Sequence, residues 1–478
     1  MNRKLLFVSV FLLSLFASCN NSKPKNSTGA YFGGHLVNPT SKYLTLIKDT
    51  TVLDTSFLDK EDNFSFRLKD LEEGLYSFQH NYENQIIYLA PGDSLLLWGN
   101  TLEFEESLHF SGIGAEKNNF LVNLFLENEK DTELVLNYYK TPPSQFAEIT
   151  DSIRTVRLDR LKDLAEKHDF SENFFEMAQK MIQFEFNNLR EQYTFLVKKY
   201  YPEFAEDFPA NFFDYREQLN FNEKTLRSNP VYLRFLENYL INLSMEDCTG
   251  DPQNNDCYDI NNFENIKQRI ELIDSLTDLP LVKNHIYNKL GSAGMVMGRN
   301  RVELRAILEL LQDKKLPSRD FRRLLTLGSI QLAFIPGINV GNTPLVTPEE
   351  KKIRFGDIIE RPAIAYIWSL NSPAHHKTQH RAIKELKKKY PDIDFIGINI
   401  DISETSAWKN TLMKYGYDLK NEYQLGSIRL QGREVGSDVF KSYLNKLLFL
   451  DKSGTVVIGD AFLSSPDFES RILEFLNL

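Results

Sequence analysis

The chain has 478 residues, of which 42% are hydrophobic and 26% are charged, and its formal net charge is −10. This length predicts two or three domains, with cores large enough to need no covalent cross-links for basic stability. The negative charge argues against a dedicated nucleic-acid binder, because phosphate contacts require a concentrated basic surface.

The N-terminal residues have the pattern of an export signal rather than of a folded element. Two basic residues precede an apolar run over residues 5–16, which is too short to span a bilayer as a permanent helix. Two small residues and Cys19 follow this run. This ending resembles the lipobox of bacterial lipoproteins, although Phe16 stands where that motif usually has leucine. The resemblance implies that residues 1–19 are a signal peptide and that its removal leaves Cys19 as the lipidated N-terminus. Ordinary cleavage that leaves an unmodified thiol is the alternative.

A polar, unpatterned segment over residues 20–28 is interpreted as a tether. It contains no acidic cluster after Cys19, unlike the surface-export signals of Bacteroidota lipoproteins. The resemblance therefore implies a lipid-anchored protein of the cell envelope, held in the outer membrane and facing the periplasm. The expected partners are the lipid membrane, through Cys19, and an unidentified envelope protein; nucleic acid is not expected.

Residues 29–112 predict an antiparallel β-sandwich-like domain. Short alternating runs are separated by turn signals such as Pro91-Gly92-Asp93. The runs are YLTLIK, NFSFRL, LYSFQH and SLLLWG. Together with YLAPGDSLLLWGN and FSGIGAEKNNFL, they resemble the N-terminal β-domain of many thioredoxin-like lipoproteins of Bacteroidota. That resemblance implies no chemistry for the domain.

Residues 113–335 predict an α-helical region, because hydrophobic residues recur there at helical spacing. Ser171 and Asn262 are expected to be N-caps of two of these helices. The stripes of Phe, Leu and Ile are interpreted as core packing rather than as a cofactor site, and no cofactor is expected.

Cys248 and Cys257 flank a loop that contains Gly, Pro and Asn. Export would place these cysteines in an oxidising compartment, so a structural disulfide is the main interpretation. A redox pair is the alternative. It is less favoured, because neither cysteine begins a recognisable helix with basic neighbours, the setting that lowers the pKa of a thiol.

Residues 336–478 predict a third domain, in the order strand, helix, strand, helix, strand, strand, helix. Such an order gives a βαβ unit followed by a hairpin and a terminal helix. The expected strands are RPAIAYIWSL, DIDFIGINID, KLLFLD and TVVIGDAF. Over residues 341–478, the stretches AIAYIWSLNSPAHH, FIGINID and LLFLDKSGTVV resemble the thioredoxin-like disulfide reductases of the membrane-anchored TlpA type. The resemblance implies a C-terminal α/β thioredoxin-like fold, and the whole chain is expected to be a multidomain α+β protein.

The reductase motif itself is missing. In that family the first strand leads into Cys-x-x-Cys, and alignment on Trp368 places the two cysteine positions at Ser372 and His375. Serine cannot form a disulfide and histidine cannot resolve a mixed one, so the required thiolate chemistry is absent. The family's cis-proline maps near Asn445 or Lys446, where the chain has no proline. No catalytic residue is therefore expected at this motif, and the domain is expected to be redox-inactive there.

The remaining polar residues of the motif have ordinary interpretations. Ser372 followed by Pro373 is a favourable helix start, in which the serine side chain caps a backbone N–H. Hydrolysis by Ser372 with His375 or His376 as the base is a minor alternative, because no third residue or oxyanion hole is recognisable. His376 and His380 are spaced i, i+4 and are weak candidates for a metal site that lacks a third ligand.

Two functions follow from these patterns. The first is a membrane-anchored thioredoxin-like lipoprotein that acts as a binding or structural module in the cell envelope. The second is a thiol–disulfide oxidoreductase that uses Cys248 and Cys257 in place of the missing motif.

Overall fold

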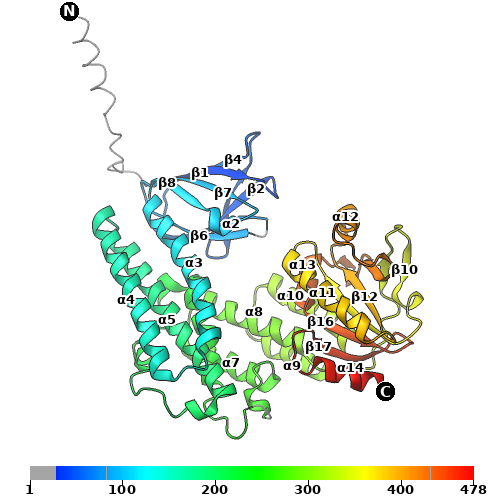
Figure 1. Cartoon of the computed structure of the whole chain (residues 1–478). Helices are drawn as coiled ribbons and strands as arrows, with labels where there is room; N and C mark the ends of the chain where they lie inside the picture. Colours follow the sequence, from blue (N-terminus) through cyan, green and yellow to red (C-terminus); the bar gives the residue numbers. More distant parts are fainter. Residues whose placement is uncertain (1–27, 82, 253–254, 431, 478) are drawn as a thin grey trace, which may run out of the picture. The chain divides into compact units, whose positions relative to one another are not determined.

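The computed structural model describes residues 28–477 apart from residues 82, 253–254 and 431 (Figure 1). The expected signal peptide, Cys19 and nearly all of the tether lie outside the described residues. The chain divides into two compact units. The first unit comprises Met1–Tyr258 and Leu276–Val282, and the second unit comprises Asp259–Ser275 and Lys283–Leu478. The expected helical region therefore contributes to both units.

The first unit begins with two four-stranded sheets that share one core. Sheet A has the order β4-β1-β7-β8, and sheet B has the order β3-β2-β5-β6. The strands are β1 (Ala30–Val37), β2 (Tyr43–Lys48), β3 (Thr51–Phe57), β4 (Asn63–Leu68), β5 (Gly74–His80), β6 (Glu83–Leu89), β7 (Ser94–Asn100) and β8 (His109–Ile113). Alternating residues of both sheets, such as Phe32, Phe66 and Phe78, fill the space between them.

The sandwich is not purely antiparallel. β1 pairs in parallel with β7, from Tyr31 opposite Ser94 to Val37 opposite Asn100. The other pairings of the two sheets are antiparallel. The antiparallel expectation was wrong for this one pair, because five strands, four of sheet B and β4 of sheet A, lie between β1 and β7 in the chain. A connection of that length permits a parallel crossover.

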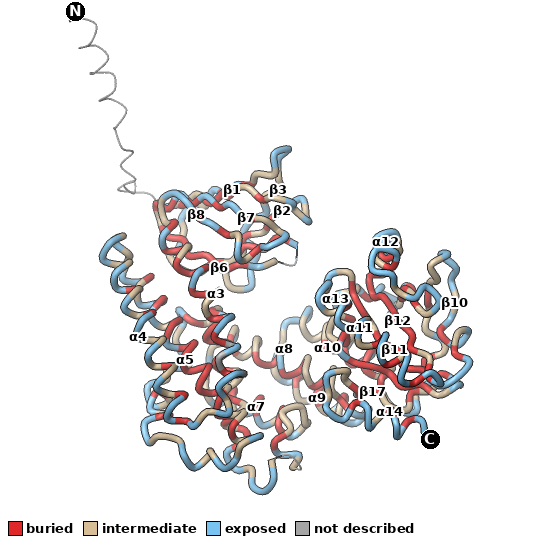
Figure 2. The backbone as a smooth tube through the Cα atoms, viewed as in Figure 1, coloured by how far each residue is buried: buried red, intermediate tan, exposed pale blue. Residues whose placement is uncertain are grey.

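Helices make up the rest of the first unit. They are α2 (Phe104–Ser107), α3 (Ala115–Tyr138), α4 (Pro143–His168), α5 (Glu172–Tyr200) and α6 (Pro230–Leu243), with short 3₁₀ helices η2 (Pro202–Phe204), η3 (Asp214–Gln218), η4 (Lys224–Leu226) and η5 (Asp256–Tyr258). The hydroxyl of Ser171 accepts a hydrogen bond from the N–H of Phe174, so the expected N-cap of α5 is confirmed. Buried residues run along α5 from Phe174 to Val197, and α3, α4 and α6 pack on it (Figure 2).

The second unit has a seven-stranded sheet in the order β10-β9-β13-β12-β11-β16-β17. Its strands are β9 (Pro344–Val346), β10 (Lys352–Arg354), β11 (Ala363–Trp368), β12 (Asp394–Asn399), β13 (Glu422–Leu425), β16 (Lys446–Leu450) and β17 (Val456–Phe462), beside a separate hairpin of β14 (Arg429–Leu430) and β15 (Arg433–Glu434). β11 pairs in parallel with β12 and antiparallel with β16, which pairs antiparallel with β17. The four expected strands are thus neighbours in this sheet.

The helices of this part of the chain are α7 (Phe263–Leu276), α8 (Pro280–Met297), α9 (Arg301–Gln312), α10 (Ser318–Gln331), α11 (Pro373–Lys389), α12 (Thr405–Tyr415), α13 (Ser437–Phe440) and α14 (Phe468–Leu476), with 3₁₀ helices η6 (Leu332–Phe334), η7 (Phe355–Asp357), η8 (Leu419–Asn421) and η9 (Lys441–Tyr443). Asn262 Oδ1 accepts a hydrogen bond from the N–H of Glu264 at 2.9 Å, as expected of an N-cap. Ile383 of α11, Trp408 of α12 and Phe468 of α14 join the strands in one core.

Candidate functional site

The turn between β11 and α11 is held by the buried carboxylate of Asp401. This carboxylate accepts hydrogen bonds from the hydroxyl of Ser369 at 3.0 Å and from the N–H of Leu370 at 2.6 Å. The side-chain amides of Asn371 and Asn399 donate to it at 3.2 and 3.0 Å. Because four donors converge on one carboxylate, the chain just before α11 has a fixed course.

Ser372 and Pro373 start α11, but not in the expected way. Ser372 is the N-cap residue and Pro373 the first helical residue. The expected side-chain cap was wrong, since the Ser372 hydroxyl makes no capping hydrogen bond to the described residues of α11. Its backbone has φ −134° and ψ 65°, whereas Ser171, which does cap α5, has φ −62° and ψ 148°. The extended geometry typical of a capping residue is therefore missing at Ser372.

A groove of about 560 Å³ lies beside the first turns of α11. Its lining residues are Ala374, His375, Thr378, Gln379, Ala382, Asn445, Leu463 and Ser464. His375 and Asn445, the positions that the resemblance assigns to the second cysteine and the region of the cis-proline, meet here. The Nε2 atom of His375 lies 3.0 Å from Oδ1 of Asn445. Burial lowers the pKa of His375, so the groove contains no fully charged side chain at neutral pH.

Two polar atoms of this groove are buried without a hydrogen-bond partner among the described residues. They are Oε1 of Gln379 and Nδ1 of His375. The other end of the Gln379 amide donates to the carbonyl of Leu444 at 3.3 Å, which fixes the direction of Oε1. Because native proteins rarely leave buried polar atoms unpaired, these two atoms are expected to be satisfied by a group other than the described residues.

His376 and His380 do not converge on a common point. His380 Nδ1 donates to the carbonyl oxygen of His376 at 2.7 Å, and its Nε2 lies 3.1 Å from Oε1 of Glu422. His376 Nδ1 lies 2.7 Å from the Tyr417 hydroxyl, and burial lowers the pKa of His376 to about 4. The two imidazole rings are 6.2 Å apart and perpendicular. Among the described residues, no group of three or more His, Cys, Asp or Glu is placed to hold a metal ion.

Glu422 is the centre of a buried polar cluster behind these histidines. Its carboxylate accepts hydrogen bonds from the Tyr366 hydroxyl at 2.6 Å and from Trp368 Nε1 at 2.9 Å, in addition to its contact with His380. Burial, reinforced by the charge of Glu422, raises the pKa of Tyr366 well above its ordinary value, so Tyr366 stays a donor. The cluster ties α11 to β11 and β13. Local patterns missed it because no motif links Glu422 to the histidines in sequence.

Cys248 and Cys257 form a disulfide, with their Cα atoms 5.8 Å apart. Cys248 follows the end of α6, and Cys257 lies in the three-residue η5. Neither sulfur therefore stands at the N-terminus of an α-helix, where the pKa of a thiol would be lowered. Cys257 is exposed to solvent, and Cys248 is partly buried.

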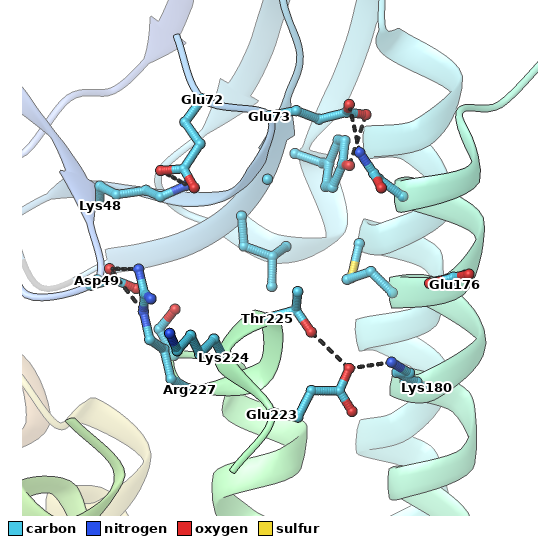
Figure 3. A pocket seen from close by; sticks show the side chains of 16 residues that line it. Lys48, Asp49, Glu72, Glu73, Glu176, Lys180, Glu223, Lys224, Thr225 and Arg227 are labelled. Atoms are coloured by element: carbon cyan, nitrogen blue, oxygen red, sulfur yellow. Dashed lines mark hydrogen bonds and ion pairs between the residues drawn. The ribbon is translucent and has the colours of Figure 1, made fainter. Parts of the chain in front are cut away.

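A second cavity, of about 370 Å³, opens in the first unit between turns of sheet B and helices α5 and η4 (Figure 3). Charged side chains line it in opposite pairs, including Arg227 with Asp49 at 2.8 Å and Lys180 with Glu223. Glu73 accepts a hydrogen bond from Asn173 at 3.1 Å. Because most of these charges are paired within the lining, the cavity favours neither anionic nor cationic ligands. Sequence reasoning missed it, since its walls come from five separate segments.

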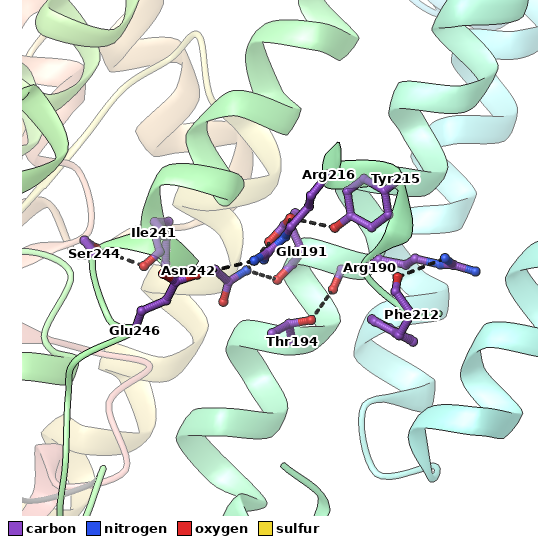
Figure 4. Close-up of polar contacts among 10 residues, drawn as sticks. All are labelled: Arg190, Glu191, Thr194, Phe212, Tyr215, Arg216, Ile241, Asn242, Ser244 and Glu246. Atoms are coloured by element: carbon purple, nitrogen blue, oxygen red, sulfur yellow. Dashed lines mark hydrogen bonds and ion pairs between the residues drawn. The ribbon is translucent and has the colours of Figure 1, made fainter. Parts of the chain in front are cut away.

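The helical core of the first unit contains a buried carboxylate of its own, Glu191 (Figure 4). Arg216 donates to both of its oxygens, at 2.9 and 2.8 Å. The Tyr215 hydroxyl and the Asn242 amide each donate to it at 2.6 Å. These bonds compensate the charge fully and fix η3 and α6 on α5, which is a structural role.

None of the described helices combines the length and the apolar character needed to cross a bilayer. No protein-family model matches the chain, and no curated protein matches it.

Solved structures do match one part of the chain. The thioredoxin domain of a thiol-disulfide oxidoreductase from Bacteroides vulgatus is 17% identical, and the match covers 30% of this chain and 98% of that one, with a TM-score of 0.22. A SCO1/SenC family lipoprotein from Bacillus anthracis is 15% identical over 30% of this chain and 95% of its own, with a TM-score of 0.23. A secreted disulfide oxidoreductase from Mycobacterium tuberculosis is 14% identical over 29% and 96%, with a TM-score of 0.20. The structural neighbours are thus thioredoxin-like proteins. No activity follows from similarity at this level.

Proposed function

We propose that the chain is a lipid-anchored envelope protein whose second unit binds an uncharged, extended stretch of polypeptide in the groove beside α11, without thiol chemistry there. The main support is the groove, where Gln379 Oε1 and His375 Nδ1 are buried without a partner among the described residues. The chain has no cysteine after Cys257, so this groove offers no thiol for a mixed disulfide.

A polypeptide suits the chemistry of the lining. Peptide N–H groups would donate to Gln379 Oε1 and His375 Nδ1, and small apolar side chains would pack against Ala374, Ala382 and Leu463. The lining carries no full charge that would attract an acidic or basic segment. Specificity would therefore come from hydrogen bonds to the peptide backbone and from the shape of the groove.

Site-directed photocrosslinking tests this binding. A benzoylphenylalanine side chain at Thr378, an exposed lining residue, is expected to give protein adducts in intact envelopes. The same group at Lys388, an exposed residue of α11 outside the groove, serves as the matched control. Equal adducts at both positions, or none at Thr378, would contradict the proposal. Mass spectrometry of the adducts identifies the partner.

The anchor is proposed to be a lipid on Cys19, with the protein held in the outer membrane and facing the periplasm. The resemblance to a lipobox supports this assignment. Growth with an alkyne-bearing fatty acid is expected to label the wild-type chain, and Cys19→Ala is expected to abolish the label and the membrane association. External protease should leave the protein intact in whole cells and digest it in opened ones.

A thiol–disulfide oxidoreductase that uses Cys248 and Cys257 is the second candidate, because the two cysteines form a disulfide and Cys257 is a solvent-exposed residue. We expect the purified protein to reduce insulin no faster than the background reaction with dithiothreitol. Turnover above that background which disappears in Cys248→Ser would support the second candidate against the first.

A further inference from the structure

The face of sheet A that points away from the core differs in composition from the rest of this acidic chain. Its large outward side chains are Tyr31, His35, Arg67, Leu96, Trp98 and His109, and together they are called the outer face below. None of its four strands, β4, β1, β7 and β8, contains Asp or Glu, although the chain has a net charge of −10. Asp59, in the β3–β4 connection, is a carboxylate at its rim, near His35.

The outer face is partly aromatic. Leu96 lies opposite Gly33 of β1, and Trp98 lies opposite His35 on one side and His109 on the other. The ring of Tyr31 lies across Gly33, since a Cβ atom there would come within 2.5 Å of the Tyr31 hydroxyl. Leu96 and Trp98 are 45% and 49% exposed, whereas their neighbours Leu95 and Leu97 face the core.

The expected anchor begins at the same end of the sheet. The described chain starts at Thr28 and enters β1, whose Tyr31 lies opposite Ser94 of β7. Eight residues lie between Cys19 and Thr28, and the nine steps along the chain give a reach of at most about 30 Å. Leu96 is two residues farther along β7 than Ser94, or about 7 Å. A bilayer that held Cys19 would therefore be within reach of the outer face.

We infer that the outer face rests on the surface of the bilayer that anchors the chain, with Trp98 and Leu96 in the interfacial layer. The inference rests on the proposed anchoring through Cys19. Tryptophan is favoured at the depth of the lipid headgroups, where its ring is buried and its N–H stays hydrated. Arg67 would attract anionic headgroups, as would Lys23 and Lys25 of the tether. The four strands contain no carboxylate that would repel such headgroups.

The tryptophans of this chain allow a direct test. The chain has three, and Trp368 and Trp408 are fully buried, so Trp98 is the one that a bilayer can contact. Residues 20–478 with a histidine tag in place of Cys19 are bound to vesicles of phosphatidylethanolamine, phosphatidylglycerol and a nickel-chelating lipid. Because the tag replaces Cys19, it attaches the chain to the vesicle at the position of the proposed lipid. The test therefore does not depend on whether Cys19 is lipidated in the cell.

Trp98 emission is expected to shift to the blue on these vesicles and to be quenched by lipids brominated in the acyl chain. Trp98→Phe should remove the quenching, and Leu96→Ser with Arg67→Gln should weaken it. Phe57→Ser removes a 72% exposed aromatic residue of sheet B and should leave the quenching unchanged. Circular dichroism confirms that each variant is folded.

Two results would overturn the inference. One is unchanged quenching of Trp98 by aqueous iodide, together with no quenching by brominated lipid. The other is a blue shift that needs no vesicles and grows with protein concentration, which would identify a second copy of the chain as the occupant. Failure of the fatty-acid labelling of Cys19 would contradict the proposed anchor but would leave this measurement interpretable.

Discussion

Lys446 places its ammonium group inside the second unit, at the start of β16. Its Nζ donates to Oε1 of Gln331 at 3.1 Å and to the carbonyl of Val296. No carboxylate pairs with it among its described hydrogen-bond partners, and burial lowers its pKa to about 8. The folded state therefore holds this proton less tightly than the unfolded state does.

We expect the stability of the second unit to rise with pH above neutrality. Between about pH 8 and the ordinary lysine value near 10.4, the unfolded state binds more protons than the folded one, so raising the pH favours folding. From pH 8 to 9.5 the gain should be about 1 to 2 kcal/mol. Urea denaturation at the two pH values measures it. Lys446→Met should remove the dependence; an equal rise in the variant would assign it to other groups.

The arrangement of His376 and His380 predicts that zinc does not bind there. Both ring nitrogens of His380 already face partners, and one nitrogen of His376 faces Tyr417. Isothermal titration of zinc should give the same heat for wild type and for the double variant His376→Ala with His380→Ala. A tight binding event lost in the variant would show that the rings turn to form a chelate.

At the scale of elements, two serines at helix starts give a matched comparison. Ser171 caps α5 and also donates to Glu73 Oε1 at 2.5 Å, whereas Ser372 makes no capping bond to the described residues of α11. Ser171→Ala should lower the free energy of unfolding by about 1 to 2 kcal/mol, and Ser372→Ala by less than about 0.5 kcal/mol. Chemical denaturation measures both. Similar losses would mean that the Ser372 hydroxyl caps α11 in solution.

Local patterns predicted many elements and the pairings β11–β12 and β16–β17, but not the pairing of β1 with β7. The runs YLTLIK and NFSFRL are β2 and β4 to the residue, because alternation marks a strand with one buried face. β13 was missed because its inward residues, Glu422 and Gln424, are polar and are buried only with partners from distant segments. The parallel pairing of β1 with β7 also depends on a connection that no local pattern encodes.

From the sequence, Ser372 and His375 were expected to mark a motif without catalytic residues, and no binding groove was predicted beside them. Alignment on Trp368 brought attention to His375 and to the region of Asn445, which do meet in the structure. The unpaired atoms of the groove could not be predicted, since they depend on how Gln379 is held by Leu444. The Glu422 cluster could not be predicted either, because its members lie on β11, α11 and β13, which are separate in the sequence.

At the scale of the molecule, the two units are expected to respond differently to reduction. The Cys248–Cys257 disulfide joins two positions of the first unit that are nine apart in sequence, and closing this short loop should stabilise that unit by about 2 to 3 kcal/mol. Reduction should therefore shift a transition of the first unit to lower urea concentration and leave the second unit unchanged.

Fluorescence separates the two responses. Trp368 and Trp408 lie in the second unit, so the emission of Trp98→Phe reports that unit alone. In this variant, dithiothreitol should leave the urea midpoint of the fluorescence transition unchanged. Circular dichroism should show a second transition, that of the first unit, whose midpoint shifts to lower urea concentration. Cys248→Ser with Cys257→Ser should reproduce the shift without reductant. A common shift in both signals would mean that the units unfold together.

The chain passes between the two units three times, because Leu276–Val282 returns to the first unit between two segments of the second. The Thr277 hydroxyl donates to the carbonyl of Phe221 at 2.7 Å, and the N–H of Asp278 donates to Asn222 Oδ1, also at 2.7 Å. A gene fusion with a single breakpoint therefore cannot transfer either unit complete to another protein. For the same reason, neither unit can be produced whole as one continuous segment of the chain.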